Sequence, residues 1–87
     1  MTRETQRLFE FGPFRLDVTE RLLHKNGQTV PLTAKVFDLL VLLVEHHGRL
    51  VEKEVLLKSL WPDTFVEEAN LSVNVSTLRK ALGESPN

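Results

Sequence analysis

Residues 67–83, EEANLSVNVSTLRKALG, combine one apolar face with one face of small polar side chains. Leu71, Val75, Leu78 and Leu82 recur at intervals of four, three and four residues, the spacing of a single stripe along an α-helix. We predict that this stripe faces a hydrophobic core. The residues predicted to point away from the core are mostly short: Ala69, Ser72, Val73, Ser76, Thr77 and Lys80.

A β-strand is the alternative for part of this segment, because apolar and polar side chains alternate over residues 71–76. The end of the segment favours the helix, since residues 78–82 are strong helix formers and Gly83 suits the left-handed residue that ends a helix. An amphipathic surface helix would explain these features. A helix that enters a DNA major groove would too, with Val73 against a thymine methyl and Ser76 and Thr77 near base edges.

Composition limits what the chain can be. Its 87 residues allow one small domain with a single core, and they are too few for an enzyme with separate substrate and cofactor lobes. The sequence has no Cys, so it has neither a disulfide framework nor a thiolate metal site. It has no signal peptide and no apolar run of about eighteen residues, so we expect a cytoplasmic domain. The net charge of −1 is unusual for a nucleic-acid binder, which concentrates Lys and Arg.

Residues 8–31 are predicted to form a small antiparallel sheet. An apolar, β-rich run with a turn at Gly12-Pro13 predicts the first strands. The dipeptide Asn26-Gly27 then marks a tight hairpin, because both residues tolerate a positive φ. We expect either Leu22 or Leu23 to face the core, together with Val30. The apolar residues of the first run are Phe9, Phe11, Phe14, Leu16 and Val18.

From Thr33 the period changes to that of a helix, predicted over residues 33–47 and apolar nearly all round. Thr33 is a suitable N-cap, and Leu32 with Phe37 has the spacing of a hydrophobic staple. His46 and His47 fall where the helix ends. Adjacent histidines do not face one metal ion across a helical turn, so we predict a capping or surface role for them and no metal site.

A second helix is predicted over residues 53–61 and is ended by Pro62. Glu52 is a weak N-cap, although its carboxylate suits the helix N-terminus. The predicted buried side consists of Leu56, Leu57, Leu60 and Trp61. Two successive helices joined by a short connection, the second over residues 67–82 with a polar outer face, have helix-turn-helix order.

Four segments together carry a family resemblance: FGPFRLD, RLLHKNGQTVPL, LTAKVFDLLVLLVEHHGRLVEKEVLLKSLW and LSVNVSTLRKALG. In this order they resemble the OmpR/PhoB-type winged helix-turn-helix domain of bacterial transcription regulators, over most of residues 1–87. The resemblance implies an α+β fold with an N-terminal four-stranded antiparallel sheet and three helices, the third in the major groove. Members continue into a C-terminal β-hairpin, the wing, whereas this sequence stops at Asn87. The predicted fold therefore lacks the wing, and weak DNA binding is expected.

The resemblance also assigns roles to residues. It places contacts from the third helix at Ala69, Val73, Asn74, Ser76, Thr77 and Arg79. Several of these positions often carry Arg or His in members of the family, whereas Ala69, Ser76 and Thr77 carry no charge here. The predicted base contacts are Val73, Ser76 and Thr77. The predicted phosphate contacts are Trp61, Asn70, Asn74, Arg79 and Lys80. The predicted RNA polymerase contacts are Asp63, Glu67 and Glu68. Ordinary alternatives remain for each group: a packed core Trp, a solvated helix cation, and carboxylates solvated at a helix start.

The function predicted is sequence-specific binding of double-stranded DNA for regulation of transcription; the alternative is a winged-helix protein–protein interaction module. An enzyme is not predicted, because no nucleophile with an adjacent base, phosphate-binding Gly-rich loop or apolar pair of carboxylates is found. The expected partners are DNA, RNA polymerase and a second copy in tandem on direct repeats. No cofactor or small-molecule substrate is expected. Because the DNA-binding segment comes first, we expect a one-component parent protein, membrane-tethered further along.

Overall fold

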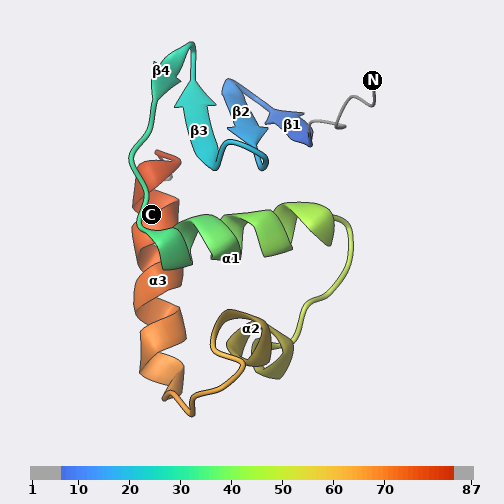
Figure 1. Cartoon of the computed structure of the whole chain (residues 1–87), viewed down its shortest axis with the longest axis vertical. Helices are drawn as coiled ribbons and strands as arrows, with labels where there is room; N and C mark the ends of the chain where they lie inside the picture. The colour runs from blue at the N-terminus through green and yellow to red at the C-terminus, as the bar shows by residue number, and fades with distance from the viewer. Residues whose placement is uncertain (1–6, 84–87) are drawn as a thin grey trace, which may run out of the picture. The chain divides into compact units, whose positions relative to one another are not determined.

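The computed structural model describes residues 7–83, which form two compact units. The first ends at Pro31 and contains the strands; the second begins at Leu32 and contains the helices (Figure 1). Each unit has its own set of buried apolar side chains.

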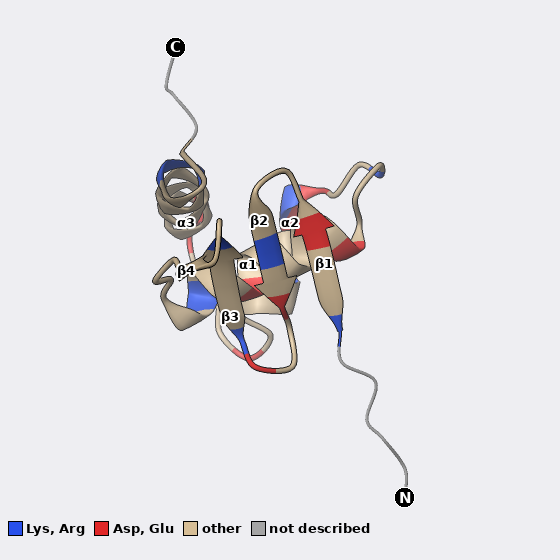
Figure 2. Cartoon of the chain, turned by 90° about the horizontal axis from the view of Figure 1, so that it is seen from above, with Lys and Arg blue, Asp and Glu red and all other residues tan. Residues whose placement is uncertain are grey.

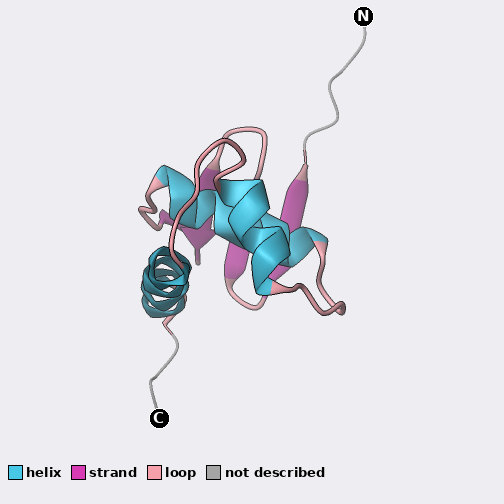
Figure 3. Ribbon diagram, turned by 90° about the horizontal axis from the view of Figure 1, so that it is seen from below, coloured by secondary structure: helices cyan, strands magenta, loops and turns pink. Residues whose placement is uncertain are grey.

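The N-terminal unit is a four-stranded antiparallel sheet in the order β1-β2-β3-β4, as predicted. Its strands are β1 (Leu8–Phe11), β2 (Phe14–Asp17), β3 (Leu22–Lys25) and β4 (Gln28–Thr29). Each strand pairs with the next along the chain, with Phe11 opposite Phe14 and Leu16 opposite Leu23. The sheet is therefore a meander that needs only short turns (Figure 1), and its strands are drawn in magenta in Figure 3.

The turn between β3 and β4 confirms the predicted hairpin. Asn26 and Gly27 have φ angles of 51° and 85°, the positive values that a two-residue hairpin turn requires. A second non-glycine residue with positive φ, Arg21 at 58°, lies in the turn before β3, which the sequence did not indicate. There the Asp17 carboxylate accepts a hydrogen bond from the Glu20 N–H at 2.9 Å, which stabilises the turn locally.

The buried side chains of the sheet follow the alternation of its strands. Phe14, Leu16 and Leu23 are almost fully buried, whereas Leu22 is 39% exposed, so Leu23 is the inward residue of the pair. The rings of Phe11 and Phe14 stack at 5.4 Å between centroids, and the Lys25 ammonium lies 5.6 Å from the Phe14 ring. Phe14 therefore has an aromatic neighbour and a cationic one.

The second unit consists of α1 (Ala34–Glu45), α2 (Lys53–Leu60) and α3 (Glu68–Ala81), each of which contacts the other two. Its core is formed by the leucines and other apolar side chains that these helices share: Val36, Phe37, Leu39, Leu40, Leu56, Leu60, Leu71 and Leu78. The helices run in different directions, and α1 and α3 cross rather than lie parallel (Figure 1).

The start of α1 is as predicted. The Thr33 hydroxyl accepts a hydrogen bond from the Val36 N–H at 3.2 Å, which satisfies a donor that the helix cannot pair internally. The helix ends at Glu45, two residues before the predicted end, and His46 is its C-cap. The His46 ring bonds to the Leu42 carbonyl through Nδ1 at 2.8 Å, which confirms the capping role. No group of residues able to hold a metal ion occurs between residues 7 and 83.

The burial predicted for α2 was too complete. Leu56 and Leu60 are buried, but Leu57 and Trp61 are only half-buried. Glu52 is the N-cap without a side-chain hydrogen bond, as its residue type predicted. The helix stops at Leu60 because Trp61 leaves the helical region, with φ −132° and ψ 72°.

None of the helices in the described part is long and apolar enough to cross a membrane. No strand follows α3 up to residue 83. The four residues at the end of the sequence, on which the expected absence of a wing depends, lie outside the described residues.

Candidate nucleic-acid interface

Residues 68–81 form an uninterrupted α-helix of 14 residues, so the strand alternative for residues 71–76 is wrong. Leu71 and Leu78 are each 4% exposed and anchor α3 to the core. Val75 and Leu82 of the same stripe are half-buried. After the helix the Gly83 N–H donates to the Lys80 carbonyl at 3.0 Å with Gly83 at φ 82°, a left-handed ending that glycine accommodates without strain.

The opposite face of α3 is exposed and uncharged over its middle turns. Val73 is 64% exposed, and Ser76 and Thr77 are exposed beside it. Residues three and four apart are neighbours on a helix, so these three side chains form one ridge. Short side chains let another surface approach the helix closely, and two hydroxyls supply donors and acceptors. We call Val73, Ser76 and Thr77 the α3 ridge.

The cations of α3 are confined to its last turn. Arg79 and Lys80 are exposed there, and α3 is otherwise uncharged in Figure 2 apart from its acidic start. Cations at a helix C-terminus are stabilised by the macrodipole, which explains their position without any ligand. They also leave one end of the ridge positively charged.

The two asparagines of α3 differ in their availability. Asn70 is exposed, whereas Asn74 is half-buried and its Nδ2 donates to the Asn70 main-chain carbonyl at 2.7 Å. This bond uses one of the two amide protons of Asn74. Of the two asparagines predicted to contact phosphates, Asn70 therefore has the more accessible side chain. The Asn74 side chain is partly committed to a hydrogen bond within its own helix.

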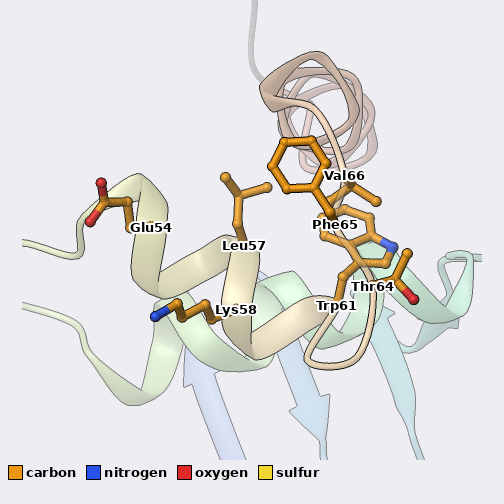
Figure 4. A pocket seen from close by; sticks show the side chains of 7 residues that line it. All are labelled: Glu54, Leu57, Lys58, Trp61, Thr64, Phe65 and Val66. Atoms are coloured by element: carbon orange, nitrogen blue, oxygen red, sulfur yellow. The ribbon is translucent and has the colours of Figure 1, made fainter.

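The burial of Trp61 is intermediate between that expected of a packed core residue and that expected of an exposed phosphate contact. It is the C-cap of α2 and is half-buried rather than packed in the core. Its ring lines an open, mostly apolar groove of about 190 Å³, which we call the loop groove (Figure 4). The groove is lined by Glu54, Leu57, Lys58, Trp61, Thr64, Phe65 and Val66. Part of the indole is thus accessible to a ligand.

The predicted polymerase contacts Asp63, Glu67 and Glu68 are all exposed in the connection between α2 and α3 or at the start of α3. The Glu68 carboxylate pairs with the Lys53 ammonium at 3.0 Å, and because both side chains are more than half exposed, the pair contributes little stability. Glu67 is the N-cap of α3 but makes no side-chain capping bond.

Two features of this region were missed from the sequence. Phe65 is 89% exposed, although an aromatic residue is expected to be mostly buried. The signal in the sequence that could have indicated this exposure is the position of Phe65 between Pro62 and several carboxylates. The Lys35 ammonium lies 5.4 Å from the Trp61 ring, a contact between residues 26 positions apart that no local pattern indicates.

Comparison with known proteins agrees with this geometry. The family model described as "Transcriptional regulatory protein, C terminal" matches residues 27–87. The sensory transduction protein RegX3 of Mycolicibacterium smegmatis is 34% identical over 80 residues, covering 91% of this chain and 35% of RegX3. The chain thus spans about a third of the length of the curated relatives it matches.

Solved structures give the same result. The response regulator DrrB of Thermotoga maritima, an OmpR/PhoB homologue, superposes with a TM-score of 0.85 at 30% identity, covering 92% of this chain and 36% of DrrB. The RstA DNA-binding domain of Klebsiella pneumoniae, solved in complex with the RstA box, has a TM-score of 0.80 at 30% identity, covering 91% of this chain and 79% of that domain. The chain therefore belongs to the OmpR/PhoB-type DNA-binding domains of transcription regulators, and not to a family of enzymes.

Proposed function

We propose that the chain binds double-stranded DNA sequence-specifically through α3 and so directs the regulation of transcription. The observation that carries the proposal is the α3 ridge, an exposed row of small side chains on a helix that Leu71 and Leu78 hold from behind. A major groove admits one α-helix, and a ridge of this kind allows the helix to enter deeply. The RstA domain, which shares this fold, was solved on its DNA site, which supports the proposal.

The α3 ridge supplies base recognition in this proposal. The Val73 side chain packs against a thymine methyl, and the hydroxyls of Ser76 and Thr77 bond to base edges. Hydroxyls donate and accept, so they discriminate among bases less sharply than a bidentate Arg. Specificity is therefore expected to be modest at these positions.

In this proposal, residues of α3 and the residue that ends α2 make the contacts to the DNA backbone. Arg79 and Lys80 neutralise phosphates, and the amides of Asn70 and Asn74 together with the Trp61 indole N–H donate neutral hydrogen bonds to phosphate oxygens. Only the first two contacts displace counterions, because the others carry no charge.

This assignment predicts a shallow dependence of DNA affinity on salt. Each neutralised phosphate contributes about −0.9 to the slope of log affinity against log salt concentration, so two cations give a slope of about −2. Fluorescence anisotropy of a labelled duplex, titrated with the chain at several salt concentrations, measures it. A site selected from random duplexes and a scrambled control should give similar slopes but different affinities. A slope steeper than about −5 would mean that other cations make most of the phosphate contacts.

The loop groove favours a second role, contact with a protein. We propose that the Phe65 side of this groove, with the carboxylates around it, meets RNA polymerase when the domain is on DNA, whereas Trp61 faces the duplex. Between residues 52 and 68 the chain carries five carboxylates and two ammonium groups, beside the exposed ring of Phe65. An exposed aromatic ring surrounded by carboxylates fits a basic protein surface. The carboxylates are those of Glu52, Glu54, Asp63, Glu67 and Glu68.

Phe65→Ala is predicted to separate the two roles. Removal of the exposed ring should lower transcription activation in vitro by about tenfold, because one aromatic anchor often supplies that much binding energy. DNA affinity in a retardation assay should stay unchanged. Leu50→Ala is the matched control, since Leu50 is an equally exposed apolar residue (92%) outside the loop groove. Equal loss of activation in both variants would reject a specific role for Phe65.

Two finer points belong to the same proposal. A domain that reads bacterial chromosomal DNA acts in the cytoplasm, and we place this one there. Two copies bound in tandem would explain recognition of direct repeats, since a single α3 spans few base pairs. Footprinting on a selected site with one half-site or two distinguishes single from tandem occupancy.

A further inference from the structure

Lys35 connects two helices through one ammonium group. It lies in the first turn of α1, and its ammonium donates a hydrogen bond to the main-chain carbonyl of Leu60, the last residue of α2. The same ammonium lies 5.4 Å from the centre of the Trp61 ring. A single cation thus contacts both the end of α2 and the aromatic residue that follows it.

The position of Lys35 in the first turn of α1 is electrostatically unfavourable for its charge, and its contact with the end of α2 offsets this. A cation in the first turn of a helix is opposed by the macrodipole, and Thr33 and Ala34 leave no carboxylate in that turn to offset it. The Leu60 carbonyl lies at the opposite, partly negative end of another helix, and an aromatic face attracts a cation. The environment that Lys35 reaches therefore favours its charge, whereas the turn from which it starts does not.

The contact with Lys35 leaves the indole N–H of Trp61 able to donate a hydrogen bond. A cation–π contact uses the face of the ring, whereas the indole N–H points outward from the ring edge in the ring plane. Trp61 is half-buried and lines the open loop groove, so part of the indole is accessible. Because the Lys35 ammonium holds the face of the Trp61 ring, the N–H at the edge of the ring keeps one orientation.

We propose that Lys35 is a positioning residue that fixes the Trp61 indole so that its N–H is presented to a DNA phosphate. This inference rests on the proposed function and adds a residue that lies outside the helix-turn-helix pair. Lys35 acts through Trp61 and does not itself neutralise a phosphate, because its ammonium is committed to the Leu60 carbonyl and the Trp61 ring.

The contact is tested first in the free protein, where Trp61 is the only tryptophan and therefore the only source of indole fluorescence. Lys35→Met keeps most of the side-chain length and removes the charge. It should shift the emission maximum and increase quenching by acrylamide. Lys35→Arg should restore both values, because a guanidinium also donates to carbonyls and stacks on aromatic rings.

Lys25→Met is the matched control. It removes an equal charge and a comparable cation–π contact, the one to Phe14 at 5.6 Å, so Trp61 emission should not change. Circular dichroism of all variants shows whether the helices persist. Unchanged Trp61 emission and quenching in a folded Lys35→Met chain would overturn the proposal.

DNA binding provides the second test. Lys35→Met should weaken affinity about three- to tenfold, the range expected when the one hydrogen bond from the Trp61 N–H to a phosphate is lost. The same change in a Trp61→Phe background should have almost no effect, since the N–H that Lys35 positions is already gone. The salt slope should not change.

An equal loss in the Trp61→Phe background would overturn the positioning role, and so would a salt slope lowered by about 0.9, which is the sign of a direct phosphate contact. Failure of the unaltered chain to bind any duplex would reject the proposed function and the DNA part of this inference. The fluorescence comparison would still accept or reject the hold of Lys35 on Trp61.

Discussion

Replacing Arg79 and Lys80 together with alanine should lower the affinity for a selected duplex by about 100-fold, since each charged contact contributes about 1.5 kcal/mol or more. The salt slope should fall from about −2 toward zero, because these cations are the proposed phosphate partners on α3. Both residues are exposed in the last turn of α3, and alanine is a good helix former, so the fold should persist. Retardation of a labelled duplex across salt concentrations measures both quantities.

The matched control is Arg15→Ala with Lys25→Ala, which removes the same charge from the sheet. If that pair lowers affinity equally, net charge rather than the position of the cations on α3 controls binding. If the α3 pair changes nothing, α3 is not the contact surface. The protein–protein interaction module would then be the better explanation of this fold.

Leu78→Ala should produce a large loss of stability. Leu78 is 4% exposed, and removal of a buried leucine side chain costs about 2–5 kcal/mol of the free energy of unfolding. A domain of this size has roughly 5–10 kcal/mol in total. The midpoint of thermal unfolding should therefore fall by about 10 °C or more. Circular dichroism during heating, or urea titration, measures the change.

Val73→Ala is the natural comparison, because Val73 lies on the same helix but is 64% exposed. Its stability should change by no more than about 0.5 kcal/mol, as for most surface substitutions. Its preference for thymine at one position of the selected site should weaken. If Val73→Ala destabilised the chain as much as Leu78→Ala, the assignment of inner and outer faces of α3 would be wrong.

Local chemistry made most of the fold predictable. The Asn26-Gly27 turn and the Thr33 cap each depend on residues close in sequence, and both occur as predicted. The choice between helix and strand over residues 71–76 depended on the segment as a whole. The helix forms because Leu71 and Leu78 both reach the core only at a helical period.

The exposure of the predicted contact residues was easier to predict than the contacts that their side chains make. Exposure of the α3 ridge follows from periodicity, so it was predictable. The bond from Asn74 to the Asn70 carbonyl depends on side-chain rotamers, and the contact of Lys35 with Trp61 depends on how α1 and α2 pack. Neither is encoded in a local pattern. Leu57 and Trp61 were predicted as buried because hydrophobicity alone does not show where a core ends.

The distribution of charge along α3 has a consequence for the approach to DNA. Glu67 and Glu68 stand at its start and Arg79 and Lys80 near its end, and α3 is about 21 Å long. Although the chain carries a net charge of −1, the potential of a duplex exerts a torque on this helix, repelling one end and attracting the other. We therefore expect Arg79 and Lys80 to lead as a molecule diffuses toward the double helix, before any atom touches it.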